Sequence, residues 1–326
     1  MQSTNELKVN IGTQCDGTSV SRDIKRLPHL LIAGGERGEA RAYLTSLLLE
    51  VAKTNAPSVL RVLAMHLGTE ANALPHLLAN ATEDEAEAET MLLWLKNEAD
   101  RRFVLFEAAG VHNIDAYNEK APDKLYHVIA AIGDISKLTK RSVEYAAMLA
   151  AKARATGIYL LAAEENASAR TIPSLLKANI PSRIALKTET RAQSRVILDT
   201  AGAEKLSAGD ILFLPIGTAE PQRLSRNAAE ISVSEIAELH SPAERITIAY
   251  EKPSETPLLR LALETAIEHG GVSTALLQRK LHIGSKKAAG LIEEMETAGY
   301  VGEYCGSKPR RLLLTKTELE KLIKEI

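Results

Sequence analysis

Short apolar runs alternate with longer amphipathic segments along the first two-thirds of the chain. Five runs are apolar nearly throughout: His29–Ala33, Val59–Met65, Val128–Ile132, Ile158–Ala163 and Ser182–Leu186. Amphipathic segments such as Glu87–Phe106 and Ser142–Thr156 lie between them. Strands that are apolar on both faces and separated by helices are typical of a parallel sheet covered on both sides. The pattern therefore predicts an α/β fold.

The C-terminal residues follow a different order. Leu258–His269 is amphipathic and ends at a Gly-Gly pair, and Ser273 is placed to cap a second helix. Ser285 is placed to cap a third helix, which ends at a glycine. The segment YVGEYCGSKPRRLLLT then reads as two strands around a GSKP turn. Two helices, a turn, a third helix and a β-hairpin predict a winged helix-turn-helix, which most often binds DNA and in other proteins binds protein.

These patterns divide the chain into two domains joined by a linker. We expect an α/β domain over residues 1–240 and a winged-helix domain over residues 257–326. Residues 241–256 contain prolines and many polar residues, which favours a linker or a short return strand.

Basic residues gather where a winged helix would meet DNA. At 100° per residue, Lys286, Gly290 and Glu293 share one stripe of the third helix, with Lys287 beside it. Side chains at the start of such a helix read base edges, and basic residues in the wing bind phosphates. The predicted DNA-binding residues are Arg279, Lys280, Lys286, Lys287, Glu293, Lys308, Arg310 and Arg311.

Composition indicates the cellular compartment and the kind of DNA contact, but no particular function. The formal net charge of the 326 residues is −2, so DNA contact must come from a local patch. Cys15 and Cys305 match no metal or disulfide spacing, which predicts no metal site and a reducing, cytoplasmic setting. No apolar run approaches the roughly 20 residues of a membrane span, so we expect none.

Several segments, in order, resemble the FtsK/SpoIIIE family of DNA translocases. The resembling segments are LPHLLIAG (Leu27–Gly34), WLKNEADRRF (Trp94–Phe103), HNIDAYNEK (His112–Lys120), AKARATGIYLLA (Ala151–Ala162), LLKANIPSRIAL (Leu175–Leu186), SRVILDTAGAEKL (Ser194–Leu206), and QRKLHIG with AAGLIEEMETAGYVG near the C-terminus. The resemblance runs from about Leu7 to Leu314.

This resemblance implies a RecA-like P-loop domain followed by a winged helix. It also implies assembly as a ring around double-stranded DNA, through which ATP hydrolysis between subunits drives the strand. The winged helix is then implied to read short DNA sequences. We expect no counterpart in this sequence of the family's membrane anchor, its linker or the small domain before the motor.

The phosphate-binding loop departs from the family's GxxxxGK(S/T) pattern. The segment after the first apolar run reads Gly34-Gly35-Glu36-Arg37-Gly38-Glu39-Ala40-Arg41. Aligned without a gap, Glu39 replaces the last glycine, Ala40 the phosphate-binding lysine and Arg41 the magnesium-binding hydroxyl. Moving the register to Gly38 still supplies no lysine, and an arginine fork does not reproduce an ammonium.

Two further parts of the nucleotide site are altered. Where the family has Asp-Glu after an apolar strand, this chain has Gly133 and Asp134. If Asp134 serves instead as the metal-binding aspartate, Ile135 takes the glutamate position. The family's Thr-Gln-Arg-Pro segment is replaced by AEENAS (Ala163–Ser168). Because phosphoryl transfer depends on positioning and charge stabilisation, these changes predict lost hydrolysis, and we expect neither ATP nor Mg²⁺ as a cofactor.

The winged helix departs as well. Where the family has Asn and Arg on the exposed stripe, this chain has Lys286 and Gly290, while Glu293 is kept. The change removes a predicted guanine contact and preserves charge, which favours DNA binding with altered or relaxed sequence preference. In the α/β domain, Asn179, Pro181, Arg183, Ser194, Arg195 and Asp199 are candidates for subunit or DNA contact, or simply for folding.

Three functions follow. The favoured one is a DNA-binding pseudo-ATPase that acts as a scaffold or regulator, alone or in a ring with an active family member. The second is an active translocase with an atypical phosphate loop. The third is a winged-helix DNA-binding regulator whose RecA-like domain serves only assembly.

Overall fold

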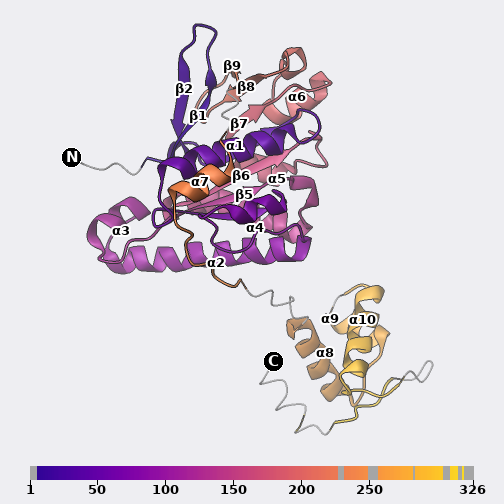
Figure 1. Cartoon of the computed structure of the whole chain (residues 1–326). Helices are drawn as coiled ribbons and strands as arrows, with labels where there is room; N and C mark the ends of the chain where they lie inside the picture. Colours follow the sequence, from indigo (N-terminus) through magenta and orange to yellow (C-terminus); the bar gives the residue numbers. More distant parts are fainter. Residues whose placement is uncertain are drawn as a thin grey trace. The chain divides into compact units, whose positions relative to one another are not determined.

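A computed structural model describes residues 6–226, 231–248, 256–281, 283–303, 309–314 and 318. The chain divides into two compact units, an N-terminal unit of residues 1–249 and a C-terminal unit of residues 250–326. Figure 1 shows both units, coloured along the sequence.

The N-terminal unit is built on one nine-stranded sheet of order β2-β1-β9-β8-β7-β3-β6-β5-β4. Its strands are β1 (Lys8–Thr13), β2 (Ser19–Asp23), β3 (Leu30–Ala33), β4 (Leu60–Met65), β5 (His127–Ile132), β6 (Ile158–Glu164), β7 (Ser182–Ala185), β8 (Asp210–Leu214) and β9 (Gln222–Ser225). Strands β7, β3, β6, β5 and β4 run parallel, as the five apolar runs predict. Strands β8, β9, β1 and β2 extend the sheet antiparallel, which the sequence pattern did not predict.

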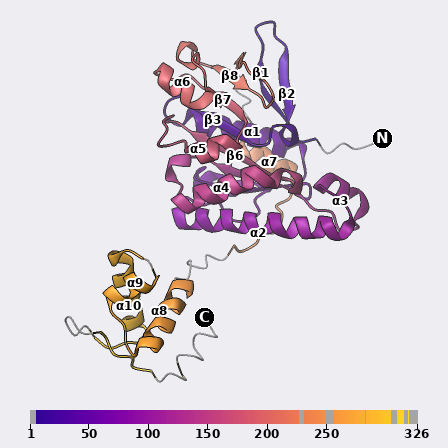
Figure 2. The same cartoon turned by 180° about the vertical axis from the view of Figure 1, so that it is seen from behind.

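Helices cover both faces of this sheet (Figures 1 and 2). Helices α1 (Glu39–Thr54) and α7 (Val233–Leu239) pack on one face and α2 (Glu85–Ala109), α4 (Lys140–Lys152) and α5 (Ser174–Asn179) on the other. The remaining helices of this unit are α3 (Ile114–Lys120) and α6 (Arg191–Leu198), with short 3-10 helices at Ile24–Arg26, Thr69–Ala73, Ile135–Lys137, Ala153–Thr156 and Ala203–Lys205.

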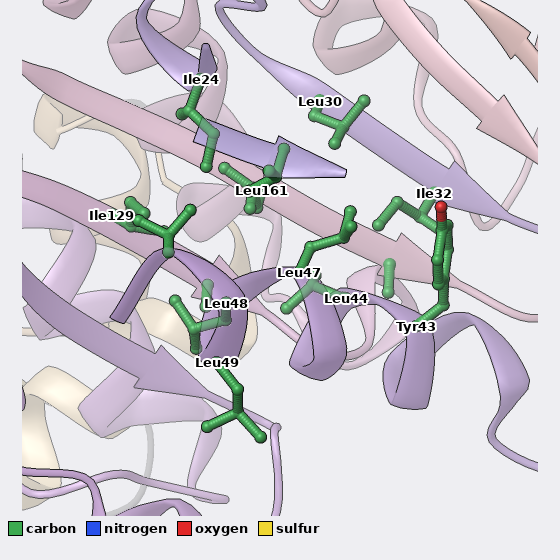
Figure 3. Packing of buried hydrophobic residues seen from close by; sticks show 14 of the residues in the cluster. Ile24, Leu30, Ile32, Tyr43, Leu44, Leu47, Leu48, Leu49, Ile129 and Leu161 are labelled. Carbon is green, nitrogen blue, oxygen red and sulfur yellow. The ribbon is translucent and has the colours of Figure 1, made fainter. Parts of the chain in front are cut away.

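Alternate side chains of the central strands enter opposite cores. Leu30 and Ile32 of β3 pack in the cluster under α1, while Leu31 and Ala33 pack in the cluster under α2 and α4. Figure 3 shows the first cluster, in which leucines of α1 lie against strand residues such as Leu161. Because a strand's successive side chains point to opposite faces, a strand covered twice must be apolar throughout.

The buried Arg102 pairs with Glu98 of the same helix, α2, and also ties this helix to the sheet. The fully buried Arg102 donates to the Glu98 carboxylate at 2.7 Å and to the carbonyl oxygens of Tyr126 at 2.9 Å and Thr156 at 2.8 Å. These carbonyls precede β5 and β6, so Arg102 satisfies backbone groups that would otherwise be buried without a donor. The segment that contains Arg102, WLKNEADRRF (Trp94–Phe103), therefore contributes to the stability of the fold.

The chain after α7 packs back onto the N-terminal unit as an extended segment. The amides of Ala243 and Ile246 donate to the carbonyl oxygens of Pro75 and Leu78, at 3.1 and 2.8 Å. Arg61 donates to the Glu244 carbonyl at 2.6 Å. The first part of the predicted linker is thus bound to the N-terminal unit over residues 243–248, and residues 249–255 lie outside the described part of the chain.

The C-terminal unit contains helices α8 (Thr256–His269), α9 (Thr274–Leu281) and α10 (Ser285–Thr297). Ala262, Leu263, Ala288, Leu291 and Met295 are buried among its core residues. The pairings Val272 with Arg310 and Val301 with Leu312 are antiparallel and join the described residues 309–314 to the residues that follow α8 and α10. The predicted GSKP turn falls within residues 304–308, which lie outside the described residues.

The two predicted serine caps differ in outcome. The Ser273 hydroxyl accepts from the Leu276 amide at 3.2 Å, so this cap is confirmed. At α10 the cap residue is Gly284, without a side-chain hydrogen bond, and Ser285 is already in the first turn. The prediction that Ser285 caps this helix is wrong by one residue.

Candidate functional site

The loop between β3 and α1 curls tightly on itself. Gly34, Gly35, Arg37 and Gly38 all have positive φ, between 50° and 90°. The Gly34 amide donates to the Glu164 carbonyl at 2.9 Å and the Gly35 amide to the Lys187 carbonyl at 2.8 Å, which fixes the loop to β6 and the end of β7. Glycine adopts this conformation without strain, which explains three of the four residues.

A cavity of about 520 Å³ opens beside this loop. It lies at the carboxyl ends of β3 and β7, where open α/β sheets bind ligands, and its volume is within the usual range for small-molecule sites. Its charged lining residues are Glu36, Arg37, Glu39, Glu165, Lys187, Glu189, Asp210 and Arg226. Carboxylates therefore outnumber basic groups on the cavity wall, which opposes binding of a highly charged anion.

The Glu39 side chain lies inside the loop. Its carboxylate accepts from the Glu36 amide at 3.2 Å and pairs with Arg226 at 3.5 Å. A side chain built on Gly35 would meet the same carboxylate at 2.8 Å. An acidic group thus takes a backbone donor and a guanidinium that an anionic ligand would use.

The next two positions turn away from the cavity. Ala40 is fully buried in the core under α1 and lines no part of the cavity. The Arg41 guanidinium lies near Gly38, 3.7 Å from where a Cβ at that glycine would stand. Ala40 therefore offers no cation to a phosphate, and Arg41 offers no hydroxyl to a metal ion.

Gly133 follows β5 in a space that admits no side chain. A Cβ built there would stand 2.0 Å from the His66 carbonyl oxygen and 3.0 Å from the Leu67 Cα. The Gly133 amide also donates to the Met65 carbonyl at 2.8 Å, so the β4 and β5 ends are held together. The position that the resemblance gives to an aspartate is therefore closed.

Asp134 meets a second carboxyl group that the sequence reasoning did not single out. The Ser136 amide donates to the Asp134 carboxylate and to that of Glu164, each at 3.0 Å. Glu164 is 3% exposed, and burial raises its pKa to about 7, with the Asp134 charge adding to the effect. The signal in the sequence was an acid at the very end of an apolar run.

The other candidates of the N-terminal unit hold the fold together. Arg183 donates to the carbonyl oxygens of Ile180 and Ile197, both at 3.2 Å, and pairs with Asp199. Lys177 binds the same carboxylate at 2.7 Å, and these pairs hold the pKa of Asp199 below its usual range against the opposing effect of burial. The Ser194 hydroxyl donates to the Thr200 carbonyl at 2.8 Å. These contacts support the folding interpretation of this stretch.

In the C-terminal unit the predicted DNA-binding residues differ in how exposed their side chains are. Arg279, Glu293 and Arg311 are exposed, and Lys280 is exposed with Glu268 at 3.8 Å. The Arg310 side chain is 13% exposed and pairs with Glu296. Lys308 lies outside the described residues, and nothing is described of the Lys286 and Lys287 side chains.

The described residues contain neither an arranged metal site nor a helix suited to a membrane. Within the described ranges no cluster of three or more His, Cys, Asp or Glu side chains is arranged to hold a metal ion. No described helix combines the length and apolar character that crossing a membrane requires.

Solved structures share the fold of the N-terminal unit. The cytoplasmic domain of the Thermomonospora curvata type VII secretion ATPase EccC aligns with a TM-score of 0.63 at 23% identity, over 76% of this chain and 33% of that one. The pCW3 conjugation coupling protein TcpA, solved as a monomer with ATPγS, aligns with a TM-score of 0.61 at 23% identity, over 72% of this chain and 70% of that one. The RecA-like P-loop fold is thereby confirmed.

Curated relatives match nearly the whole chain. A DNA translocase FtsK of Caldanaerobacter subterraneus is 35% identical over 98% of this chain and 48% of its own length. The DNA translocases SftA and SpoIIIE of Bacillus subtilis are 35% and 33% identical over 97% of this chain, and over 36% and 44% of their own lengths. The chain thus spans about half or less of these relatives.

These matches overturn the prediction that the chain uses neither ATP nor Mg²⁺. The relatives are DNA translocases, and TcpA was solved with an ATP analogue. The prediction gave too much weight to side chains. Backbone amides and the left-handed loop conformation hold much of a bound phosphate, and both persist here despite Glu39, Ala40 and Arg41.

Family models cover both units. The FtsK/SpoIIIE family model matches residues 1–205, and the FtsK gamma domain model matches residues 253–315. The first match exceeds half of the chain, and the relatives agree with it. This chain belongs to the FtsK/SpoIIIE family of DNA translocases and carries the family's gamma domain.

Proposed function

We propose that this chain is a DNA-binding family subunit that takes up a nucleotide but hydrolyses it very slowly, and that it acts as a scaffold or regulator. The observation that carries this proposal is the contrast within one site. The loop backbone keeps the left-handed conformation of an anion cradle, while the Gly133 position is closed to any side chain.

The fit of a nucleotide to the cavity is partial. The amides of Ala40 and Arg41 lie in the first turn of α1, where the helix itself supplies no acceptor, so they are candidate donors to a phosphate placed at this helix end. Lys187 and Arg226 on the cavity wall would supply positive charge. When bound, a nucleotide with Mg²⁺ would supply the reactive phosphoanhydride.

Slow hydrolysis is expected because the loop lacks the lysine and the hydroxyl that normally stabilise the reacting phosphates. Stabilising the charge of the transferred phosphoryl group is most of the catalysis, and a lysine and a metal-holding hydroxyl normally provide it. Ala40 is buried in the core and Arg41 turns toward Gly38. Losing such groups costs several orders of magnitude in rate.

DNA-stimulated ATP hydrolysis tests this proposal. We expect turnover at the background level for the natural chain and for the triple variant Glu39→Gly, Ala40→Lys and Arg41→Ser, because the variant leaves Gly133 unchanged. We expect tighter nucleotide binding by the triple variant only. Steady turnover by the natural chain, above that of a mock purification, would refute the slow-hydrolysis part.

The scaffold role needs association with other subunits. Large apolar side chains are exposed on α2, α4 and α5, namely Val104 at 65%, Met148 at 52% and Leu175 at 53%. Exposed apolar groups of this kind support subunit contacts. Analytical ultracentrifugation with DNA, alone and with an active family member, tests it: co-sedimentation in one ring is expected, and separate monomers would contradict it.

DNA binding is assigned to the exposed basic residues of the C-terminal unit. We expect Arg311→Ala to weaken binding to duplex DNA about threefold to tenfold at low salt and to reduce the salt slope by about one. Fluorescence anisotropy over a salt series measures both quantities. The natural and variant affinities should converge as salt rises, and an equal loss at every salt concentration would contradict a phosphate contact.

One observation favours the second candidate, an active translocase with an atypical loop. Asp134 and Glu164 share the Ser136 amide, and the pKa of Glu164, raised to about 7 by burial, suits a general base. In that case the turnover of the natural chain would rise with pH through about 7, and Glu164→Gln would abolish it.

A further inference from the structure

We propose that Arg226 is the phosphate-binding cation of this site and that Glu39 is its resident counter-ion, which an incoming phosphate must displace. The inference rests on the proposed nucleotide binding and names the residues that govern it. In this proposal the cation is not the lysine of the loop but an arginine that follows β9, three strands away from β3 in the sheet.

Arg226 is positioned for this role by contacts on three sides. It follows β9 directly, and its amide donates to the Gly209 carbonyl at 2.7 Å. Its guanidinium lies 5.9 Å from the centre of the Tyr43 ring, and the Tyr43 hydroxyl donates to the Ile11 carbonyl. The side chain is 23% exposed and lines the cavity, so its charge faces the ligand space.

Glu39 makes the contacts that a phosphate oxygen would make. One carboxylate oxygen accepts from the Glu36 amide at 3.2 Å, and the other lies 3.5 Å from the Arg226 guanidinium. A carboxylate and a phosphate compete for the same donors, because both accept charge-assisted hydrogen bonds. A single side chain therefore engages both the loop backbone and the cation.

The pair sets the affinity for phosphate. An incoming phosphate must displace the carboxylate and then remain beside a second negative charge at the mouth of the loop. Two like charges about 4 Å apart repel appreciably even in partly hydrated surroundings. Once Glu39 has moved away from Arg226, the guanidinium favours the phosphate, because it fits two phosphate oxygens at once.

Binding of ADP, followed by isothermal titration calorimetry, tests the inference without hydrolysis. We expect Glu39→Gln to tighten ADP binding about tenfold and Arg226→Gln to weaken it about tenfold. The matched control is Glu189→Gln, which removes the same charge from an exposed position elsewhere on the cavity wall. It should tighten ADP binding clearly less than Glu39→Gln, because it frees neither the Glu36 amide nor Arg226. In an Arg226→Gln background the gain from Glu39→Gln should shrink, since the two residues act on one phosphate.

Each result of these titrations either supports or overturns the inference. Equal tightening by Glu39→Gln and Glu189→Gln, or no tightening by Glu39→Gln, overturns the inference. Absence of ADP binding by every variant at millimolar ligand also overturns it, together with the nucleotide part of the proposed function. Turnover by the natural chain refutes slow hydrolysis alone, because ADP affinities do not depend on it. Circular dichroism checks folding, and Glu39→Ala repeats the test with a shorter side chain.

Discussion

Gly133→Ala is expected to lower the free energy of unfolding of the N-terminal unit by about 3 kcal/mol. The added Cβ would stand 2.0 Å from the His66 carbonyl oxygen and 2.8 Å from its carbon. Both are backbone atoms, and His66 itself has a positive φ of 54°. The two strand ends must separate to admit a methyl group. Chemical denaturation followed by circular dichroism measures the loss.

The control for Gly133→Ala is Gly110→Ala. Gly110 ends α2 with a φ of 62°, and a Cβ there would meet nothing within 4 Å. It therefore costs only the left-handed conformation, about 1 kcal/mol. If Gly133→Ala costs no more than this control, the position is not closed, and one argument for slow hydrolysis is lost. Gly133→Asp should be at least as harmful as the alanine variant, so a single substitution cannot rebuild the metal-binding aspartate.

The second large effect is a pH dependence of stability from Glu164. Its pKa is raised from the ordinary 4.5 to about 7 by burial in the folded chain. Between these values the folded state holds a proton that the unfolded state has released. The free energy of unfolding therefore falls as pH rises through this window, by up to about 3 kcal/mol in total. The favourable contribution is complete at acidic pH and lost above about pH 7.

Denaturation curves between pH 5 and pH 8 measure this effect as a slope. Glu164→Gln should flatten the slope, because glutamine does not titrate. Glu165→Gln removes the exposed neighbouring charge and should flatten the slope only slightly, because that charge raises the pKa of Glu164 less than burial does. Equal slopes for the natural chain and Glu164→Gln would mean that Glu164 ionises normally.

The central strands were predictable from the sequence, whereas the antiparallel half of the sheet was not. Runs such as Val128–Ile132 and Ile158–Ala163 are apolar throughout because helices cover both of their faces. Strand β2 has mixed exposure and reads SVSRD, and β9 reads QRLS. Such short strands carry little hydrophobic signal in the sequence. Their pairing with neighbouring strands determines their place in the sheet.

The altered loop was also predictable from the sequence, because it is a local feature. Positions 34–41 are contiguous, so their departure from a phosphate-binding pattern is visible in the sequence alone. The conclusion drawn from it, that no nucleotide is used, was wrong because the pattern records side chains while the backbone conformation does much of the holding.

By itself, the sequence determined the α/β class, the winged helix and the place of the altered site, because periodicity and local motifs are properties of neighbouring residues. Only the tertiary structure decided what fills that site. Arg226 arrives from the end of β9, Glu164 from β6, and the His66 carbonyl closes the space at Gly133. Each of these residues reaches its partner in the site because strand order and register bring the two together, and no local pattern encodes such distances.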